Sequence, residues 1–426
     1  MRTILLLAYA VSPYKGSEYA VAWNYIREMS ATNRIIVLYG KSDRDMGNFR
    51  EMREYLNHHS VTNVRFVEVT ANSRWGKEGV IYTNFIKTAL YDYLAYESWH
   101  MEAYKTAEKI IADETVDVVH FLNPIGFKEP GYLWKLDKPY VWGPIAGAHP
   151  RPYPLFKALS SKEKVIAVGR NVIHPLMLRF MPRVVSAAKR ADVIISATPH
   201  TRIQLKEYFA RDTEYLPENG ILEIENTSFV QKSDSENLKI IWIGTLCPRK
   251  GLSILLDSLS LLREKTAQWE LHVIAGGDME TALKEEAIRK GVDRHIVWHG
   301  FIPRAEVQKI LQDSHVHVIS SLGEATTTVL FEAMAKSIPT ITLDHCGMAG
   351  VVCSKCGIKI PLNSYEQVTR DLADSLYGLA CDSQRLSDLS KGAFACAHEY
   401  LWSERVKFFN RQIDKAISCF EQKTAT

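Results

Sequence analysis

Short apolar runs alternate with helical stretches along almost the whole chain, and this alternation restricts the fold more than any other feature. In the first half the runs start with TILLLAY and RIIVLYG and end with DVIISA, and in the second half they start with LKIIWIG and end with PTITL. Strands that alternate with helices form parallel sheets covered by helices. Because the pattern occurs twice, the sequence predicts an α/β protein of two Rossmann-like, doubly wound domains.

The junction between the two domains is indicated by YLPENGILEIENTSF, which contains Pro217 and an Asn219-Gly220 turn. We predict a first domain over residues 1–217 and a second over 218–402. A length of 426 residues supports this division, since it exceeds the size of one ordinary hydrophobic core.

The composition is that of a globular protein, with 46% hydrophobic and 24% charged residues. A net charge of +3 is too small to indicate nucleic-acid binding, and seven scattered cysteines fit reduced thiols in the cytoplasm. The start, MRTILLLAYAVSP, has the ingredients of a secretion signal, including Ala8-x-Ala10. It is shorter than the usual ~15–30 residues, so we expect a buried first strand instead.

The segment GEATTTVLFEAM places Glu324 and Glu332 on either side of three threonines. Threonine is a poor interior helix residue but a good helix start, because its hydroxyl caps backbone N–H groups. The pattern therefore predicts a helix that begins within residues 326–328, with Glu324 in the preceding loop. Such a helix start can hold an anion on its N–H groups, beside two acids that bind hydroxyls.

A basic loop follows the first strand of the second half, in IWIGTLCPRKGLSILL. The strand is expected to end at Gly244, and the next helix is expected to start near Gly251. Arg249 and Lys250 lie in the loop between them, where they can neutralise a diphosphate. The alternative interpretation is a solvated basic turn.

These two segments, in this order, resemble glycosyltransferase family 4, retaining enzymes of the GT-B fold. Similarity extends to PYKGSEYAVAW, ADVIISATPHTRIQL, ENGI and HVIAGGDMETALKEEAIRKGVDRHIVWHGFIP. The resemblance implies two facing Rossmann-like domains and a C-terminal helix, residues 403–420, that crosses back to the first. It also implies transfer of a sugar from a nucleotide-diphosphate sugar to a hydroxyl acceptor, with retention at the anomeric carbon.

The resemblance also implies roles for particular residues. Lys250 corresponds to the family's diphosphate-binding lysine, and Glu332 to the glutamate that takes the ribose hydroxyls. Glu324 corresponds to the acid that holds hydroxyls of the donor sugar, with the phosphates on the N–H groups near Thr327 and Thr328.

Gly16, in the loop after the first strand, would let the backbone approach the same diphosphate, because glycine has no side chain. Several positions depart from the family, including Leu122, where the family usually has a second histidine. Thr245 stands where the family usually has arginine, so either Arg249 supplies the missing charge or phosphate binding is weaker. Ala-Thr-Thr replaces the common Gly-Phe-Gly after Glu324, which leaves the donor sugar open.

Two histidines at strand ends, His120 and His149, are candidates for donating a hydrogen bond or moving a proton near the reacting sugar. Core or surface histidines are the alternative. Asp344, in TLDHCGMAGVV after the last predicted strand, is a candidate contact for the donor sugar or base, with a structural turn as the alternative.

We expect no metal and no cofactor, because Lys250 and a helix start take the place of the metal. A zinc site would draw on four residues: His345, Cys346, Cys353 and Cys356. Adjacent ligands chelate poorly, and the spacing of a structural zinc site is not complete. Asp43-x-Asp45 is similar to the metal motif of the GT-A fold, but a solvated turn is the expected structure.

Residues 151–190 hold nine Lys/Arg and one acid, Glu163. Apolar residues are interleaved with them: Phe156, Leu178, Phe180 and Met181. With the tyrosine-rich NFIKTALYDYLAYESWHMEAYK, this composition suits a surface on anionic lipid. The alternative is that the apolar residues are core and the basic residues form a solvated rim.

The sequence therefore predicts a metal-independent glycosyltransferase, peripheral on the inner face of a bacterial cell membrane. Its partners would be a nucleotide-sugar donor and a saccharide or lipid-linked acceptor, such as a capsule, O-antigen or exopolysaccharide precursor. No nucleic-acid partner is expected. Two alternatives remain: a GT-B nucleotide-sugar epimerase, and a membrane-docked, non-catalytic partner with a degenerate donor site.

Overall fold

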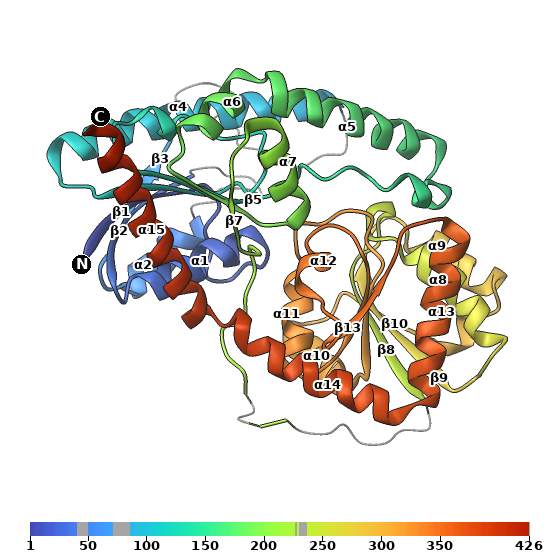
Figure 1. The fold of residues 1–426 in the computed structure, drawn as a ribbon. Helices are drawn as coiled ribbons and strands as arrows, with labels where there is room; N and C mark the ends of the chain where they lie inside the picture. Colours follow the sequence, from blue (N-terminus) through green and yellow to red (C-terminus); the bar gives the residue numbers. More distant parts are fainter. Residues whose placement is uncertain (41–49, 71–85, 226–227, 230–236, 426) are drawn as a thin grey trace. The chain divides into compact units, whose positions relative to one another are not determined.

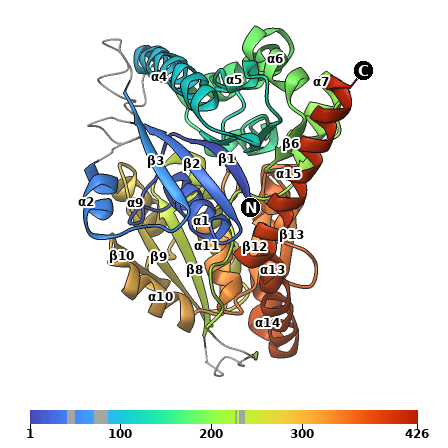
Figure 2. The same cartoon turned by 90° about the vertical axis from the view of Figure 1, so that its left-hand side faces the viewer.

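A seven-stranded parallel sheet, in the order β3-β2-β1-β4-β5-β6-β7, forms the centre of one part of the chain (Figures 1 and 2). The computed structural model describes residues 1–40, 50–70, 86–225, 228–229 and 237–425. The strands are β1 (Arg2–Ala8), β2 (Asn33–Gly40), β3 (Val64–Val69), β4 (Val118–Asn123), β5 (Tyr140–Ile145), β6 (Val193–Ser196) and β7 (Glu214–Tyr215).

Helices cover this sheet, and its strands are apolar on both faces for that reason. Along β1, Leu5 and Leu7 belong to one buried cluster while Ile4 and Leu6 belong to another. The helices of this unit are α1 (Glu18–Met29), α2 (Arg50–His58), α4 (Ile86–Asp113), α6 (Pro182–Arg190), α7 (Pro199–Phe209) and α15 (Trp402–Thr424). The C-terminal helix α15 contributes Phe409 to the second cluster, so it belongs to the first sheet's core, as predicted.

A six-stranded parallel sheet, in the order β10-β9-β8-β11-β12-β13, forms the second unit. Its strands are β8 (Leu238–Thr245), β9 (Trp269–Gly276), β10 (Ile296–Gly300), β11 (Val316–Ile319), β12 (Thr340–Leu343) and β13 (Gly357–Ile360). Its helices are α8 (Leu252–Arg263), α9 (Glu280–Arg289), α10 (Arg304–Asp313), α11 (Thr328–Ala335), α12 (Met348–Val351), α13 (Tyr365–Cys381) and α14 (Ser383–Ala397). Both units therefore confirm the predicted α/β class.

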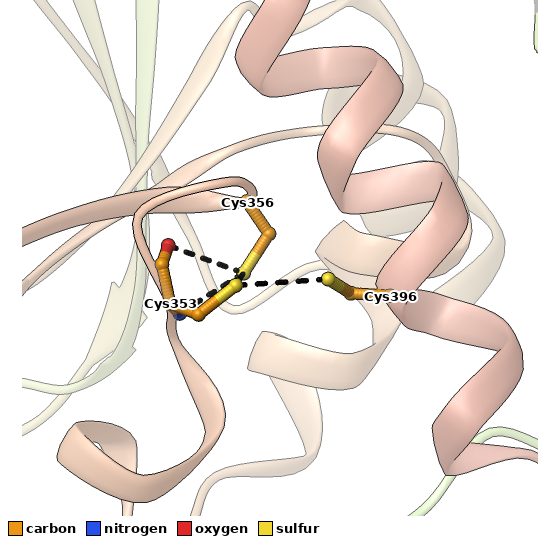
Figure 3. A group of neighbouring side chains, drawn as sticks. All are labelled: Cys353, Cys356 and Cys396. Atoms are coloured by element: carbon orange, nitrogen blue, oxygen red, sulfur yellow. Dashed lines mark hydrogen bonds between the residues drawn. The ribbon is translucent and has the colours of Figure 1, made fainter.

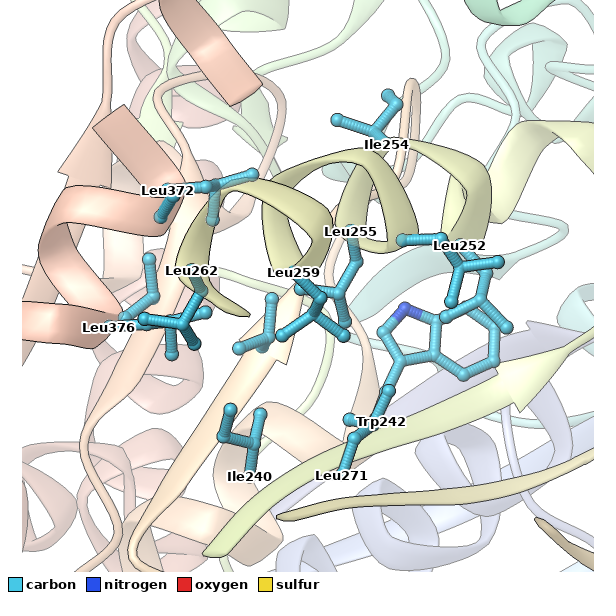
Figure 4. Packing of buried hydrophobic residues seen from close by; sticks show 14 of the residues in the cluster. Ile240, Trp242, Leu252, Ile254, Leu255, Leu259, Leu262, Leu271, Leu372 and Leu376 are labelled. Carbon is cyan, nitrogen blue, oxygen red and sulfur yellow. The ribbon is translucent and has the colours of Figure 1, made fainter. Parts of the chain in front are cut away.

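The core of the second unit lies between α8, α13 and one face of the sheet (Figure 4). The stripe on α8 has helical spacing and faces Ile240 and Trp242 on β8 and Leu271 on β9. It consists of Leu252, Leu255, Leu259 and Leu262. Ile241 belongs to a different buried cluster on the other face, as the two-residue period of a strand requires.

The two compact units do not coincide with the predicted domains at every point. The first comprises Met1–Ala148, His174–Asn219 and Trp402–Thr426, and the second comprises His149–Ile173 and Gly220–Leu401. Residues 149–173, which the prediction placed in the first domain, are part of the second. The helix α5 (Ser161–Phe180) passes from one unit to the other.

Two further predictions were a protein that lies on a membrane without crossing it and a solvated turn at Asp43-x-Asp45. No helix in the described part of the chain is both long enough and apolar enough to cross a bilayer. Asp43 and Asp45 lie outside the described residues.

Candidate functional site

A lysine and a glutamate meet where β8 and β11 end, in the second unit. Lys250 closes the short helix η3 (Pro248–Lys250), and its Nζ lies 2.7 Å from Oε1 of Glu324. Arg249 contacts the same oxygen and donates a hydrogen bond to the carbonyl oxygen of Gly323, at 3.2 Å. The side chains of Lys250 and Glu324 are only 15% and 12% exposed. The structure thus brings together three of the predicted site residues.

Backbone geometry explains why the two loops approach so closely. Gly251 has φ +67°, and a Cβ at this position would overlap the carbonyl oxygen of Ser320. The Leu322 amide donates to the carbonyl of Arg249 at 2.8 Å, and the Ser320 hydroxyl donates to the carbonyl of Lys250 at 3.2 Å. Neighbouring parallel strands release their loops at one edge of the sheet, which is where such folds bind ligands.

The helix after the threonines starts where the sequence predicted. The N-cap of α11 is Thr327, with extended backbone, and Thr328 is the first helical residue. The Thr327 side chain makes no capping hydrogen bond. The helix start follows Glu324 in the same loop, and the positive end of its dipole favours an anion there.

Glu332 and Asp344 also lie in the second unit, each with a basic partner. Arg304 donates to one oxygen of Glu332 at 2.9 Å, and Gln308 donates to the other at 3.1 Å. The Asp344 carboxylate lies 3.4 Å from Nζ of Lys359. The Arg304 side chain is exposed and can move away, so a ribose bound at Glu332 would share or replace the hydrogen bond from Arg304.

Arg151, which the sequence did not mark as a site residue, lies beside the same loop. A Cβ at Gly323 would overlap the Arg151 guanidinium and would lie 3.1 Å from Nε2 of the buried His149. Burial, and next the charge of Arg249, lower the pKa of Arg151. Three basic side chains, those of Arg151, Arg249 and Lys250, thus surround the single carboxylate of Glu324. The net positive charge favours binding of an anion.

Helix α5 holds this arginine in place. Asn171 accepts a hydrogen bond from the Arg151 amide at 2.6 Å and donates one to the Arg151 carbonyl at 2.9 Å. Arg170 donates to the carbonyl of His149 at 3.2 Å. Burial, and next the charge of Arg151, lower the pKa of Arg170 to about 10. The basic segment 151–190, which was predicted to face lipid or to form a solvated rim, thus also contributes residues to this site.

His149 is among the residues that the structure brings together at this site, whereas His120 belongs to the core of the first unit. The His149 ring packs edge-on against His345 at 5.6 Å between centroids, and His345 Nε2 lies 3.1 Å from the carbonyl oxygen of Pro150.

His120 is fully buried, with Nδ1 2.8 Å from the Tyr25 hydroxyl and Nε2 2.7 Å from the Gly143 carbonyl oxygen. Burial lowers its pKa to about 4. Both ring nitrogens are occupied by the protein, which argues against the predicted catalytic role and for a structural one.

Gly16 precedes α1 in the first unit, and a Cβ at this position would meet no atom within 4 Å. The space that the predicted backbone approach needs is therefore present. Its role toward a diphosphate stays a prediction.

Helix α5 also exposes a row of large apolar side chains. They are Val165, Ile166, Val168, Val172, Ile173, Leu176 and Phe180. Of the apolar residues predicted to face lipid, Phe180 is exposed, whereas Leu178 is fully buried in the first core. Met181 and Phe156 are partly buried against the two cores.

Comparison with known proteins gives a match for residues 223–377 to the family "Glycosyl transferases group 1". The amylovoran biosynthesis glycosyltransferase AmsK of Erwinia amylovora is 25% identical over 27% of this chain and 30% of its own length. A phosphatidyl-myo-inositol mannosyltransferase of Mycolicibacterium smegmatis is 23% identical over 70% of this chain and 71% of its own length. Several such relatives are matched over only about a third of their length.

Among solved structures, the sucrose-phosphate synthase of Thermosynechococcus elongatus superimposes with a TM-score of 0.68. It is 14% identical to this chain, and the match covers 98% of this chain and 100% of the other. A likeness at this identity establishes the fold alone. The expected GT-B fold, two Rossmann-like domains with a C-terminal helix in the first, is confirmed.

Proposed function

Because the chain resembles the group 1 glycosyltransferases over residues 223–377 and has the GT-B fold, we propose that it transfers a sugar from a nucleotide-diphosphate sugar to a hydroxyl acceptor. The observation that carries the proposal is the cluster of Lys250, Arg249 and Arg151 around Glu324, beside the start of α11. This arrangement fits a ligand that has both a diphosphate and neutral hydroxyl groups.

In the proposed reaction, the bond between the anomeric carbon and the diphosphate breaks while the acceptor oxygen bonds to that carbon on the same face. The acceptor proton passes to the departing diphosphate oxygen. Negative charge grows on the diphosphate, and Lys250, Arg249 and the N–H groups near Thr327 and Thr328 stabilise it. When the phosphates bind Lys250 and Arg249, the Glu324 carboxylate is released from these two partners and accepts hydrogen bonds from hydroxyls of the sugar.

Release of nucleotide from a panel of UDP-, GDP-, ADP- and TDP-sugars, without acceptor, tests this proposal. We expect slow hydrolysis of one donor and a rise in melting temperature with the matching free nucleotide. The epimerase alternative predicts a new nucleotide-sugar isomer instead of free nucleotide. The degenerate-site alternative predicts a thermal shift without turnover, even with lipid-linked saccharides present. No shift with any nucleotide would refute donor binding altogether.

Glu332→Gln should weaken binding of the free nucleotide by about tenfold, because a carboxylate accepts ribose hydroxyls better than an amide does. Glu306→Gln, on the exposed face of α10, is the matched control and should leave affinity unchanged. Equal affinity of the wild type and Glu332→Gln, measured by calorimetry, would remove the ribose role.

We further propose that the acceptor is a lipid-linked precursor of a bacterial surface polysaccharide. Two relatives support this class, the amylovoran biosynthesis glycosyltransferase and the phosphatidyl-myo-inositol mannosyltransferase. The exposed apolar row on α5 supports peripheral binding to an anionic membrane. Lys162, Lys164 and Arg179 are exposed on the same helix and can approach lipid head groups.

Flotation with vesicles of anionic and neutral lipid tests the membrane proposal. The double variant Ile166→Glu/Ile173→Glu should lose most binding to anionic vesicles, because two charges replace apolar contacts. Ile288→Glu, at a similarly exposed apolar residue on α9, should bind like the wild type. Equal binding of all three proteins, or no binding of the wild type at low salt, would contradict the assignment of α5.

A further inference from the structure

Three of the seven cysteines meet in the second unit, away from the loops of the proposed donor site. Cys353 and Cys356 lie in the turn between α12 and β13, and Cys396 lies near the end of α14 (Figure 3). The Sγ atoms of Cys353 and Cys356 are 3.6 Å apart, and those of Cys353 and Cys396 are 3.8 Å apart. All three sulfurs lie within 4.8 Å of one another.

Local structure turns the first two thiols to the same side. The Cys353 carbonyl accepts hydrogen bonds from the amides of Cys356 and Gly357, both at 3.1 Å, which closes a tight turn. A Cβ on Gly357 would overlap the carbonyl oxygen of Thr340, so this turn is pressed against β12. The spacing Cys-x-x-Cys in a tight turn is the usual way for one segment to supply two ligands to zinc.

Helix α14 can approach the loop that holds Cys353 and Cys356 because Gly392, one helical turn before Cys396, has no side chain. A Cβ on Gly392 would overlap the backbone carbonyl of Lys355, so the helix touches the loop between the two cysteines. Cys396 follows four residues later, on the same face of the helix. Zinc was not expected for the set that contains His345 and Cys346, and the fold instead supplies Cys396 from a distant helix.

We propose that Cys353, Cys356 and Cys396 bind one zinc ion as thiolates, with water as the fourth ligand. Tetrahedral zinc with Zn–S bonds of ~2.3 Å places its sulfurs ~3.8 Å apart, which matches the separations found here. A disulfide, with sulfurs ~2.05 Å apart, would use only two of the three thiols. Cys356 and Cys396 are buried, whereas Cys353 reaches the surface and leaves a side for water.

The ion would join the turn before β13 to α14 and so fix the segment that follows β12. Binding releases the thiol protons to solvent and involves no change of oxidation state. This role is structural, and it is separate from the expectation that the transfer of the sugar itself uses no metal.

Cobalt titration of reduced, chelator-treated protein tests the site. We expect one Co²⁺ per chain, with thiolate-to-cobalt charge-transfer absorption that one equivalent of Zn²⁺ abolishes, and a higher melting temperature with zinc. Cys353→Ser should weaken binding at least tenfold, and Cys396→Ser should do the same. Cys381→Ser, an exposed cysteine on α13, is the control and should titrate like the wild type.

Three results would overturn the proposal. They are the absence of the cobalt absorption in reduced wild-type protein, a cobalt affinity of Cys353→Ser equal to that of the wild type, and the loss of the absorption in Cys381→Ser. Because Cys353 is exposed, its substitution leaves the core intact, so the test does not depend on the buried variants folding. A native mass two hydrogens lighter than the reduced mass would assign the cluster to a disulfide instead.

Discussion

Lys250→Met is expected to lower kcat by about 10²–10³-fold with the preferred donor, because it removes one preorganised positive charge from the departing diphosphate. The long apolar side chain of methionine retains the packing of the lysine stem, which passes within 3.6 Å of the Cβ position of Gly244. The loss should therefore reflect charge and not a cavity. Because Arg249 and Arg151 remain, binding of the free nucleotide should fall less than kcat does.

The matched control is Lys309→Met, which removes an exposed lysine on α10 of the same unit. It makes the same change of net charge and should keep wild-type kcat. Steady-state kinetics on both variants, with melting temperatures to verify folding, give the comparison. A folded Lys250→Met protein with more than a tenth of wild-type kcat would contradict the proposed role.

Gly347→Ala should also reduce activity strongly, by about 10²-fold, although Gly347 carries no functional group. A Cβ there would overlap the backbone carbonyl of Ala325 and lie 2.6 Å from Cγ2 of Thr326. Backbone cannot swing aside as a long side chain can, so the loop between Glu324 and Thr327 must move. A displacement of ~1 Å at a binding group can cost ~10²-fold in rate.

Gly169→Ala in α5 is the control for this substitution. An added Cβ at Gly169 meets no atom within 4 Å, so the variant should keep its activity. It should also gain about 1 kcal/mol of stability, because alanine is the better helix former. Kinetics and urea unfolding of both variants separate loop displacement from general unfolding. Wild-type kcat in Gly347→Ala would show that the loop tolerates the shift.

Local patterns were sufficient for much of the fold. The apolar runs and the helices between them predicted both parallel sheets, and the threonine run predicted the start of α11 at Thr327 and Thr328. The two-residue β7 and the four-residue β13 were not predicted, because β7 is too short to show a period and Lys359 interrupts the apolar run of β13. Lys250 and Glu324 were expected together from the family resemblance, and the pairing of β8 with β11 explains why their loops meet.

Other features depended on contacts between distant segments. Arg151 and Arg170 were assigned to a membrane surface because their neighbours in sequence are basic and apolar, yet Asn171 and Gly323 hold Arg151 at the site. His120 has a family-like context, but its burial between Tyr25 and Gly143 follows from strand pairing and helix packing.

The sequence by itself determined the elements, their order and the edge of the sheet where the basic loop and the acidic loop would meet. These follow from interactions within a few residues: periodicity, capping and turn formation. Only the tertiary structure decided which distant side chains join them, such as Arg151 at Glu324 and Cys396 at the Cys353 turn. These contacts depend on burial, on the close approach of the Arg151 side chain to Gly323 and on that of the Lys355 backbone to Gly392, which no local pattern encodes.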